Sequence, residues 1–209
     1  VVDAIKKIKA EVGSTVISFV DAKEAILLDL GDYKISYPVN EQLKFFMVAD
    51  RFMFNNGELE DYEDMYAEFD KYLAEALVEV EKKAEPFAVE FAKKHWNDEM
   101  HYFVGAGNQW GATYSYAMCY WEEQLWLKTK SITSNEFFHG MFEIVTKETP
   151  VTIYIGEDAQ RPLSERVANF IPRICENYTI IDSKDYELKG ISEKYRKHLS
   201  HHVMHAVNN

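Results

Sequence analysis

The sequence lacks the features that define several large classes of protein. It has only two cysteines, Cys119 and Cys175, both in apolar surroundings, so we expect core packing rather than a disulfide framework. The net charge of −12 argues against nucleic-acid binding, which needs clustered Lys and Arg, although it leaves a phosphorylated small molecule open. No apolar run reaches the length of a transmembrane helix and no signal peptide is recognisable, so we expect a soluble cytoplasmic protein.

The ends of the sequence lack the signals that usually open and close a domain. Residues 1–8 are apolar at helical spacing from the start, without an initiator Met or an N-cap residue. Residues 201–207 likewise end inside an apolar periodic run. We therefore expect the chain to be part of a longer protein. With 47% hydrophobic residues, it can form one large domain or two small lobes.

Apolar segments with helical and strand character alternate along the chain, which predicts an α/β fold with parallel, doubly wound sheets flanked by helices. The expected helices cover residues 1–11, 21–30, 41–55, 61–94, 111–128, 137–146 and 162–175, with a break or kink at Pro86. The expected strands cover residues 15–20, 33–37, 101–104, 151–155 and 178–181. The first strand should belong to one parallel sheet and the last three to another.

This alternation predicts two lobes. Residues 1–57 are expected to be the C-terminal part of a first lobe that is incomplete at its N-terminus. Residues 58–98 are expected to form a long connecting helix, and residues 99–209 a complete second lobe.

A strand followed by Gly105-Ala106-Gly107 and a helix is typical of ligand sites at the carboxyl ends of parallel strands. Small residues there let a ligand approach the backbone. A third glycine, Gly111, stands one position too late for the dinucleotide fingerprint G-x-G-x-x-G, so a dinucleotide is not expected. A tight turn without a ligand is an equal alternative at this point.

Glu122, Glu123 and His139 are the candidate acid–base residues. Neighbouring helix residues point about 100° apart, so one glutamate can face solvent while the other faces inward among aromatic residues. Burial would raise the pKa of an inward carboxyl group, which suits a general acid or base. His139 follows Glu123 by sixteen positions. The alternative is two ordinary surface glutamates and an exposed or capping histidine.

Three histidines near the end of the chain, His201, His202 and His205, raise the possibility of a metal site. His201 and His205 share a helix face, as metal ligands often do. No acidic or cysteine partner accompanies them, so we expect packing in a helix and no metal.

Three features together resemble the sugar isomerase (SIS) domain family. They are Gly105-x-Gly107, the helix pattern Tyr-Ala-x-Cys-x-x-x-Glu that ends at Glu123, and Glu136-Phe137-Phe138-His139-Gly140. The chain is most similar to bacterial fructoselysine and glucoselysine 6-phosphate deglycases, and more distantly to the isomerase half of glutamine:fructose-6-phosphate amidotransferase. The resemblance covers residues 100–185 well and residues 1–40 loosely. It implies two SIS lobes.

The resemblance implies that a 6-phosphorylated sugar–amino acid adduct is converted to an imine and hydrolysed to a sugar 6-phosphate and a free amino acid. Glu123 would be the proton shuttle and His139 the acid–base that opens the sugar ring. Gly105, Gly107 and Glu136 would contact the substrate. No metal or other cofactor is implied. The serine-rich phosphate-binding loop of the family, Ser-x-Ser-Gly-x-Thr, is not found in the sequence.

The family also implies a homodimer or higher homo-oligomer, in which a histidine of one subunit completes the site of its neighbour. An aromatic surface is the expected interface, formed by Trp110, Tyr114, Trp121 and Phe137. Two alternatives keep the fold: a phosphosugar isomerase or aminosugar-phosphate deaminase, and a sugar-phosphate-sensing module without catalysis. The pair Glu123 and His139 argues against the sensor.

Overall fold

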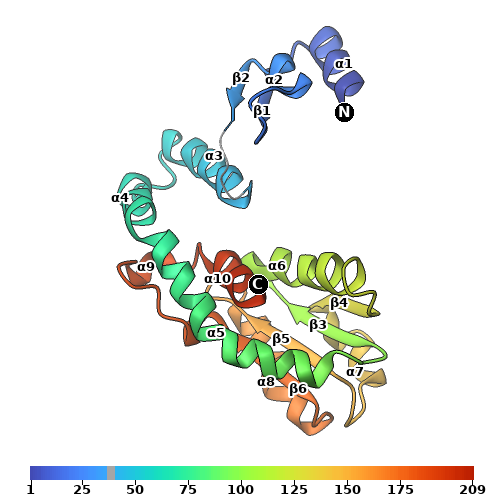
Figure 1. The fold of residues 1–209 in the computed structure, drawn as a ribbon. Coiled ribbons are helices and arrows are strands. Elements are labelled where there is room, and N and C mark those ends of the chain that lie inside the picture. The colour runs from blue at the N-terminus through green and yellow to red at the C-terminus, as the bar shows by residue number, and fades with distance from the viewer. Residues whose placement is uncertain (37–40) are drawn as a thin grey trace. The chain divides into compact units, whose positions relative to one another are not determined.

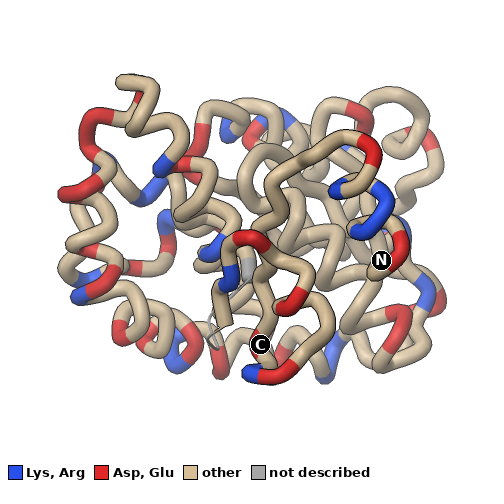
Figure 2. Tube along the Cα trace, turned by 90° about the horizontal axis from the view of Figure 1, so that it is seen from above, with Lys and Arg blue, Asp and Glu red and all other residues tan. Residues whose placement is uncertain are grey.

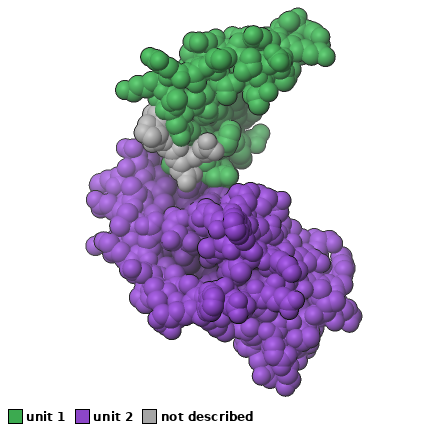
Figure 3. Space-filling model, turned by 45° about the vertical axis from the view of Figure 1, so that its right-hand side comes forward, with its two compact units in different colours: residues 1–62 green, residues 63–209 purple. Residues whose placement is uncertain are grey.

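The computed structural model describes residues 1–36 and 41–209. These residues form two compact units, Val1–Tyr62 and Glu63–Asn209 (Figure 3). In each unit, helices pack with parallel strands (Figure 1). The α/β class expected from the sequence is therefore confirmed.

The first unit contains a small parallel sheet of two strands. Its elements are α1 (Val2–Val12), β1 (Ile17–Phe19), α2 (Ile26–Leu30), β2 (Tyr33–Ile35) and α3 (Glu41–Asn55). Gly13 ends α1 with a left-handed backbone, at φ 69°, and its N–H donates to the Lys9 carbonyl. The strand predicted over 33–37 begins as expected, while Tyr37 lies outside the described residues.

The second unit is built on four parallel strands in the order β4-β3-β5-β6. Its elements are α4 (Tyr62–Glu68), a π-helical segment (Phe69–Leu73), α5 (Ala74–His95), β3 (His101–Gly105), α6 (Trp110–Ser115), a second π-helical segment (Tyr116–Glu122), β4 (Thr129–Thr133), α7 (Met141–Ile144), β5 (Val151–Ile155), α8 (Arg161–Phe170), β6 (Tyr178–Asp182), α9 (Glu193–Arg196) and α10 (Ser200–Asn208). Residues 15–20 and the three later predicted strands thus contribute to two separate parallel sheets, as expected.

Each face of the four-stranded sheet is covered by its own helical layer. One face packs Val104, Ile153 and Ile155 against residues of α7 and α8 and the segment before α7, including Phe137 and Val167. The other face packs Phe103 and His101 against Trp121 of the second π-helical segment and Phe91 of α5. Alternate residues of β3 therefore serve opposite cores, as the two-residue period of a strand requires.

The structure differs from two local expectations, a break at Pro86 and the length of the helix predicted over 111–128. Helix α5 is not broken at Pro86. The buried face of α5 includes Val80, Ala84 and Phe91, whereas Pro86 is exposed on the opposite face. Proline has no N–H, so one backbone carbonyl of the preceding turn loses its hydrogen bond within the helix. On the exposed face that carbonyl can bond to water instead. The helix predicted over 111–128 ends at Glu122, and the sequence prediction missed strand β4. This strand lies at the edge of the sheet and reads Thr-Lys-Ser-Ile-Thr, so it lacks an apolar run.

Basic and acidic residues are interspersed along the described chain (Figure 2). Basic positions are scattered along the trace and alternate with acidic ones (Figure 2). None of the helices formed by the described residues combines the length and the apolarity needed to cross a membrane. The cytoplasmic location expected from the sequence stays a prediction.

The second unit contains several buried histidines. His101, His201 and His202 are at most 4% exposed, and burial lowers the pKa of His101 to about 4, of His201 to about 3 and of His202 to about 4. Burial also lowers the pKa values of His95 and His205. These side chains are neutral in the folded protein at pH 7.

We expect the protein to lose stability as the pH falls from about 6.5 towards 5. In that range an unfolded histidine takes up a proton that the buried one excludes, so the unfolded state binds more protons. Each such histidine lowers the free energy of unfolding by up to about 1.4 kcal/mol per pH unit. Urea unfolding at pH 7.5, 6.5, 5.8 and 5.0 measures the slope. His202→Leu should reduce that slope by about one proton, and an unchanged slope would contradict this assignment.

Candidate functional site

The two candidate glutamates lie at the end of the π-helical segment that follows α6. The π-helical segment Tyr116–Glu122 closes with the Glu123 N–H donating to the Met118 carbonyl at 3.0 Å. Both Glu122 and Glu123 are exposed. Thr129 donates its hydroxyl to Glu122 at 2.5 Å. Glu123 has no side-chain hydrogen bond or ion pair with any part of the chain that the structure describes.

Neither glutamate faces inward, so the alternative of two surface glutamates describes this chain. The inward position of this turn belongs to Trp121, which is 4% exposed and packs against His101 and Phe103 with ring centroids 4.7 and 5.2 Å apart. Glu123 caps the helix and is followed by a turn, so its side chain is left at the surface. Within this chain, Glu123 is a solvated carboxylate with free lone pairs.

His139 lies in the short segment that joins β4 to α7. It follows a single 3-10 turn, Glu136–Phe138, and precedes Gly140, whose φ of 117° only glycine adopts easily. Phe137 is fully buried and anchors this turn in the core. The His139 ring is exposed, and its Nδ1 lies 3.3 Å from a carboxylate oxygen of Glu136. Glu136 can thereby orient the imidazole and leave Nε2 open to a reactant.

Glu123 and His139 belong to opposite helical layers of the unit. Trp121, two residues before Glu123, packs on the face of the sheet that carries His101 and Phe103. Phe137 and Met141, on either side of His139, pack on the face that carries Val104 and Ile153. Strand β4 connects the two layers at the edge of the sheet. The structure describes no contact between Glu123 and His139 within one chain.

The carboxyl edge of the sheet, where we expect Gly105 and Gly107 to contact a ligand, is occupied by side chains of the chain itself. A Cβ atom on Gly107, where φ is 68°, would collide with the carboxylate of Asp158, and one on Gly105 would collide with Thr113. Asp158 accepts the N–H of Asn108 at 2.8 Å. Packing against these side chains thus explains why both positions are glycine. Their contact with substrate stays a prediction.

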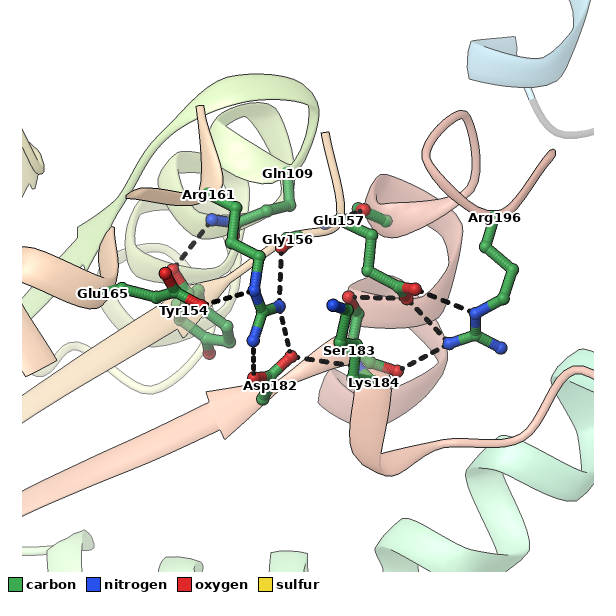
Figure 4. A network of polar contacts seen from close by, with 11 residues as sticks. Gln109, Tyr154, Gly156, Glu157, Arg161, Glu165, Asp182, Ser183, Lys184 and Arg196 are labelled. Atoms are coloured by element: carbon green, nitrogen blue, oxygen red, sulfur yellow. Dashed lines mark hydrogen bonds and ion pairs between the residues drawn. The ribbon is translucent and has the colours of Figure 1, made fainter. Parts of the chain in front are cut away.

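Buried amides and carboxylates complete this edge (Figure 4). Gln109, fully buried, donates to the Ala106 and Tyr154 carbonyls at 3.1 and 2.9 Å. Arg196 donates twice to Glu157, at 2.8 and 2.7 Å. The Gln109 bonds hold the start of α6 to the end of β5, and the Arg196 bonds hold the end of α9 to the segment after β5.

A second ion pair joins α8 to the end of β6. Arg161 donates to the Asp182 carboxylate, to Glu165 and to the Gly156 carbonyl (Figure 4). Burial alone would raise the pKa of Asp182, but the bonds from Arg161 and from the Lys184 amide outweigh it and lower that pKa. The bonds to Asp182 raise the pKa of Arg161. Arg161 is paired with carboxylates on both sides, so this network stabilises the fold by holding α8 to the end of β6.

His95, Asp98 and His101 form the one group among the described residues with a composition suited to a metal ion. One oxygen of Asp98 lies 2.7 Å from His95 Nδ1 and 2.9 Å from His101 Nδ1, and His101 Nε2 contacts the Thr152 hydroxyl at 2.8 Å. Asp98 can accept a hydrogen bond from each neutral imidazole at these distances. Hydrogen bonds alone can therefore explain these short distances, without a bound cation. The expectation of no metal stays a prediction.

The remaining predicted groups, namely the C-terminal histidines, the aromatic residues and the two cysteines, differ in burial. His201 and His202 are buried in α10, which agrees with packing. The predicted aromatic interface is wrong in part, since Trp121 and Phe137 are 4% and 0% exposed and belong to the two cores. Tyr114 is 47% exposed and Trp110 is half-buried. Cys175 is buried and Cys119 half-buried, and both are free thiols.

Sequence reasoning missed the residues that build the carboxyl edge. Glu157 and Asp158 follow β5 almost directly, and Asp182 and Ser183 stand where β6 ends. Polar residues immediately after buried parallel strands are the signal that identifies them. The arginines that pair with them, Arg161 and Arg196, carry no such local signal.

Comparison with known proteins relates this chain to enzymes that act on phosphosugars. No family model matches. The chain is 32% identical over 120 residues to fructosamine deglycase of Bacillus subtilis, a match that covers 57% of this chain and 37% of that protein. It is 34% identical over 83 residues to fructoselysine 6-phosphate deglycase of Escherichia coli, covering 40% of this chain and 24% of that protein.

Solved structures show the same fold. A candidate phosphosugar isomerase from Bacillus subtilis superimposes with a TM-score of 0.75 at 25% identity, covering 99% of this chain and 65% of that one. A candidate phosphosugar isomerase from Salmonella typhimurium gives 0.83 at 24% identity, covering 100% of this chain and 68% of that one. The chain thus spans less than two thirds of the curated relatives that it matches. The chain is thus similar in sequence to deglycases and in fold to phosphosugar isomerases, in agreement with the resemblance to the sugar isomerase (SIS) family noted from the sequence.

Proposed function

We propose that the chain carries the acid–base residues of a deglycase that acts on a 6-phosphorylated sugar–amino acid adduct. The observation that carries this proposal is the pair Glu123 and His139. Each is exposed on a segment next to β4, and each has at least one free acid–base atom. The similarity to two proteins named deglycases supports it, and the name of one of them specifies fructoselysine 6-phosphate.

The reaction needs two proton transfers before water enters. His139 would move a proton between the ring oxygen and the anomeric hydroxyl, which opens the sugar ring. Glu123 would accept a proton from C1 of the open ketoamine while the C2 oxygen takes up a proton, which gives an enaminol. Return of a proton to C2 then turns the C1–N single bond into a protonated imine. Water adds to C1 and the C–N bond breaks. One water is consumed, and a sugar 6-phosphate and a free amine are released.

The placement of the two residues in opposite layers favours a site shared by two copies of the chain. A sugar adduct is a single small molecule, and general acid–base groups must come within hydrogen-bond reach of it. In a two-fold symmetric dimer, Glu123 of one copy can meet His139 of the other, and the same contact recurs at the second site. The homodimer expected from the sequence supplies this arrangement.

A phosphosugar isomerase is the second candidate. The proton transfer between C1 and C2 also interconverts an aldose and a ketose, and the similar Bacillus subtilis structure bears the name of such an enzyme. The two reactions differ in their products. Release of free lysine from fructoselysine 6-phosphate by the intact protein supports the deglycase, while turnover of a plain sugar 6-phosphate alone supports the isomerase.

Glu123→Gln in the intact protein should lower kcat by at least about 100-fold, because an amide cannot accept the C1 proton and such groups contribute roughly 10²- to 10⁴-fold. KM should change little, since the shape of the side chain is kept. Lysine release measured by mass spectrometry follows the reaction. Glu122→Gln is the matched control, and a larger loss there than at Glu123 would overturn the assignment.

His139→Asn should also slow turnover strongly, but less so for a substrate that is already open-chain. Ring opening is bypassed in that case, so the defect should shrink when an acyclic analogue is supplied. Equal defects with cyclic and acyclic substrates would remove the ring-opening role from His139.

Mixing the two variants tests whether the site is shared. In a dimer that combines Glu123→Gln with His139→Asn chains, one site receives both changes and the other site neither. Random pairing should therefore restore about a quarter of the wild-type activity, although each variant alone is nearly inactive. If both residues act within one chain, the mixture should stay as inactive as its components.

A further inference from the structure

The outer face of α8 carries two exposed arginines that have no acidic partner. Arg166, Asn169, Phe170 and Arg173 stand at positions i, i+3, i+4 and i+7, so they share one face of α8 and of the 3-10 turn that continues it. Neither arginine forms an ion pair with any residue that the structure describes.

The missing partners are not explained by a shortage of carboxylates. Acidic residues outnumber basic ones by 35 to 23 in this chain. The acidic residues that stand near the two arginines in the sequence are paired elsewhere. Glu165 accepts from Arg161 at 2.6 Å, and Glu176 lies 3.1 Å from Lys147. The two guanidinium groups on the outer face therefore keep N–H donors for a ligand.

A groove of about 390 Å³ runs along this face of α8. It is lined by Phe138, Arg166, Asn169, Phe170 and Arg173. Two of these residues form an aromatic wall, in which the rings of Phe138 and Phe170 are 5.3 Å apart between centroids. Phe138 directly precedes His139 in the chain. The groove thus starts at the residue next to the histidine to which the proposed function assigns ring opening.

Both arginines are held before any ligand arrives. The Arg166 guanidinium carbon lies 4.1 Å from the centroid of the Phe138 ring, where the ring face attracts the cation without using its N–H donors as ordinary hydrogen bonds do. Arg173 ends a 3-10 turn whose middle residue is Pro172, and the proline ring fixes the backbone there. Less conformational entropy is therefore lost when an anion binds.

We propose that Arg166 and Arg173 bind the carboxylate of the amino acid part of the adduct, with its carbon chain against Phe138 and Phe170. This inference rests on the proposed function, which brings the adduct to His139. Guanidinium groups match carboxylates in geometry and charge. The phosphate is the other anion of the adduct, but it is attached to a hydroxyl-rich sugar. An aromatic wall suits the apolar chain that leads to the carboxylate.

Arg166→Gln and Arg173→Gln in the intact protein test this inference with two adducts. One is fructoselysine 6-phosphate, and the other is the matching adduct of cadaverine, which is lysine without its carboxylate. Each variant should raise KM for the lysine adduct about tenfold and leave kcat nearly unchanged, because a charge-assisted hydrogen bond is lost away from the reacting atoms. Neither variant should change KM for the cadaverine adduct, which the wild type should already bind more weakly.

Lys93→Gln is the matched control. Lys93 is an exposed cation of α5, the helix whose Phe91 packs on the other face of the sheet, so its loss changes the net charge equally but should leave KM unchanged. An equal rise in KM for both adducts in the arginine variants would assign the groove to the phosphate and overturn the carboxylate. Unchanged KM for both adducts would leave two solvated arginines and overturn it as well.

Binding measured without turnover separates this inference from the proposed function. Isothermal titration of fructoselysine 6-phosphate into the Glu123→Gln protein, with and without Arg166→Gln, should show an affinity about tenfold weaker when the arginine is lost. Such arginine-dependent binding in a protein that releases no amine would remove the deglycase alone. Amine release with a KM that both arginine variants leave unchanged would remove the carboxylate site alone. A protein that binds neither adduct would contradict both.

Discussion

Burial of a parallel sheet on both faces is the constraint on which the rest of the second unit depends. All five residues of β5 are buried, with Val151, Ile153 and Ile155 in the core of one face and Thr152 and Tyr154 on the other. Such a strand requires a helical layer on each side, because either face left open would expose a continuous apolar surface. Polar groups that the burial traps must find partners, as the Tyr154 hydroxyl does by donating to Asn208 of α10 at 2.9 Å. The same requirement separates Glu123 from His139, since the chain must leave one layer, run through β4 and enter the other.

This constraint also explains how much of the fold could be read from the sequence. Strands β3, β5 and β6 were predictable because a short run rich in apolar and β-branched residues indicates a buried strand. Strand β4 was not, since an edge strand is half-solvated and Thr129–Thr133 carries mixed polarity. The helix before it was predicted too long for a related reason. Trp126 has no turn-forming character, so the left-handed stop that it provides is invisible to rules based on Gly, Asn and Pro.

The candidate site was predictable in its residue types but not in its environment. Glu123 and His139 were identified by their resemblance to a family motif, and the aromatic residues around Glu123 left open whether one glutamate faces inward. The aromatic pattern described the core correctly, but Trp121 fills the inward place and leaves the glutamates outside. Similarly, Gly105 and Gly107 indicated close approach of something to the backbone. In the structure that neighbour includes the carboxylate of Asp158, whose position depends on packing between distant strands.

Local rules and the global fold agree over most of the second unit, and the exception lies next to a proposed functional residue. Natural sequences violate local preferences mainly where function compensates for the cost. Gly107 and Gly140 adopt positive φ without strain, because glycine has no Cβ. Trp126 adopts it with strain, and it does so on the turn that carries the exposed Glu123. A solvated carboxylate with no partner, an indole without a packing neighbour and a histidine held on the opposite layer are three separate oddities of one chain. The shared site proposed above would bring a histidine of a second copy to the exposed carboxylate of Glu123.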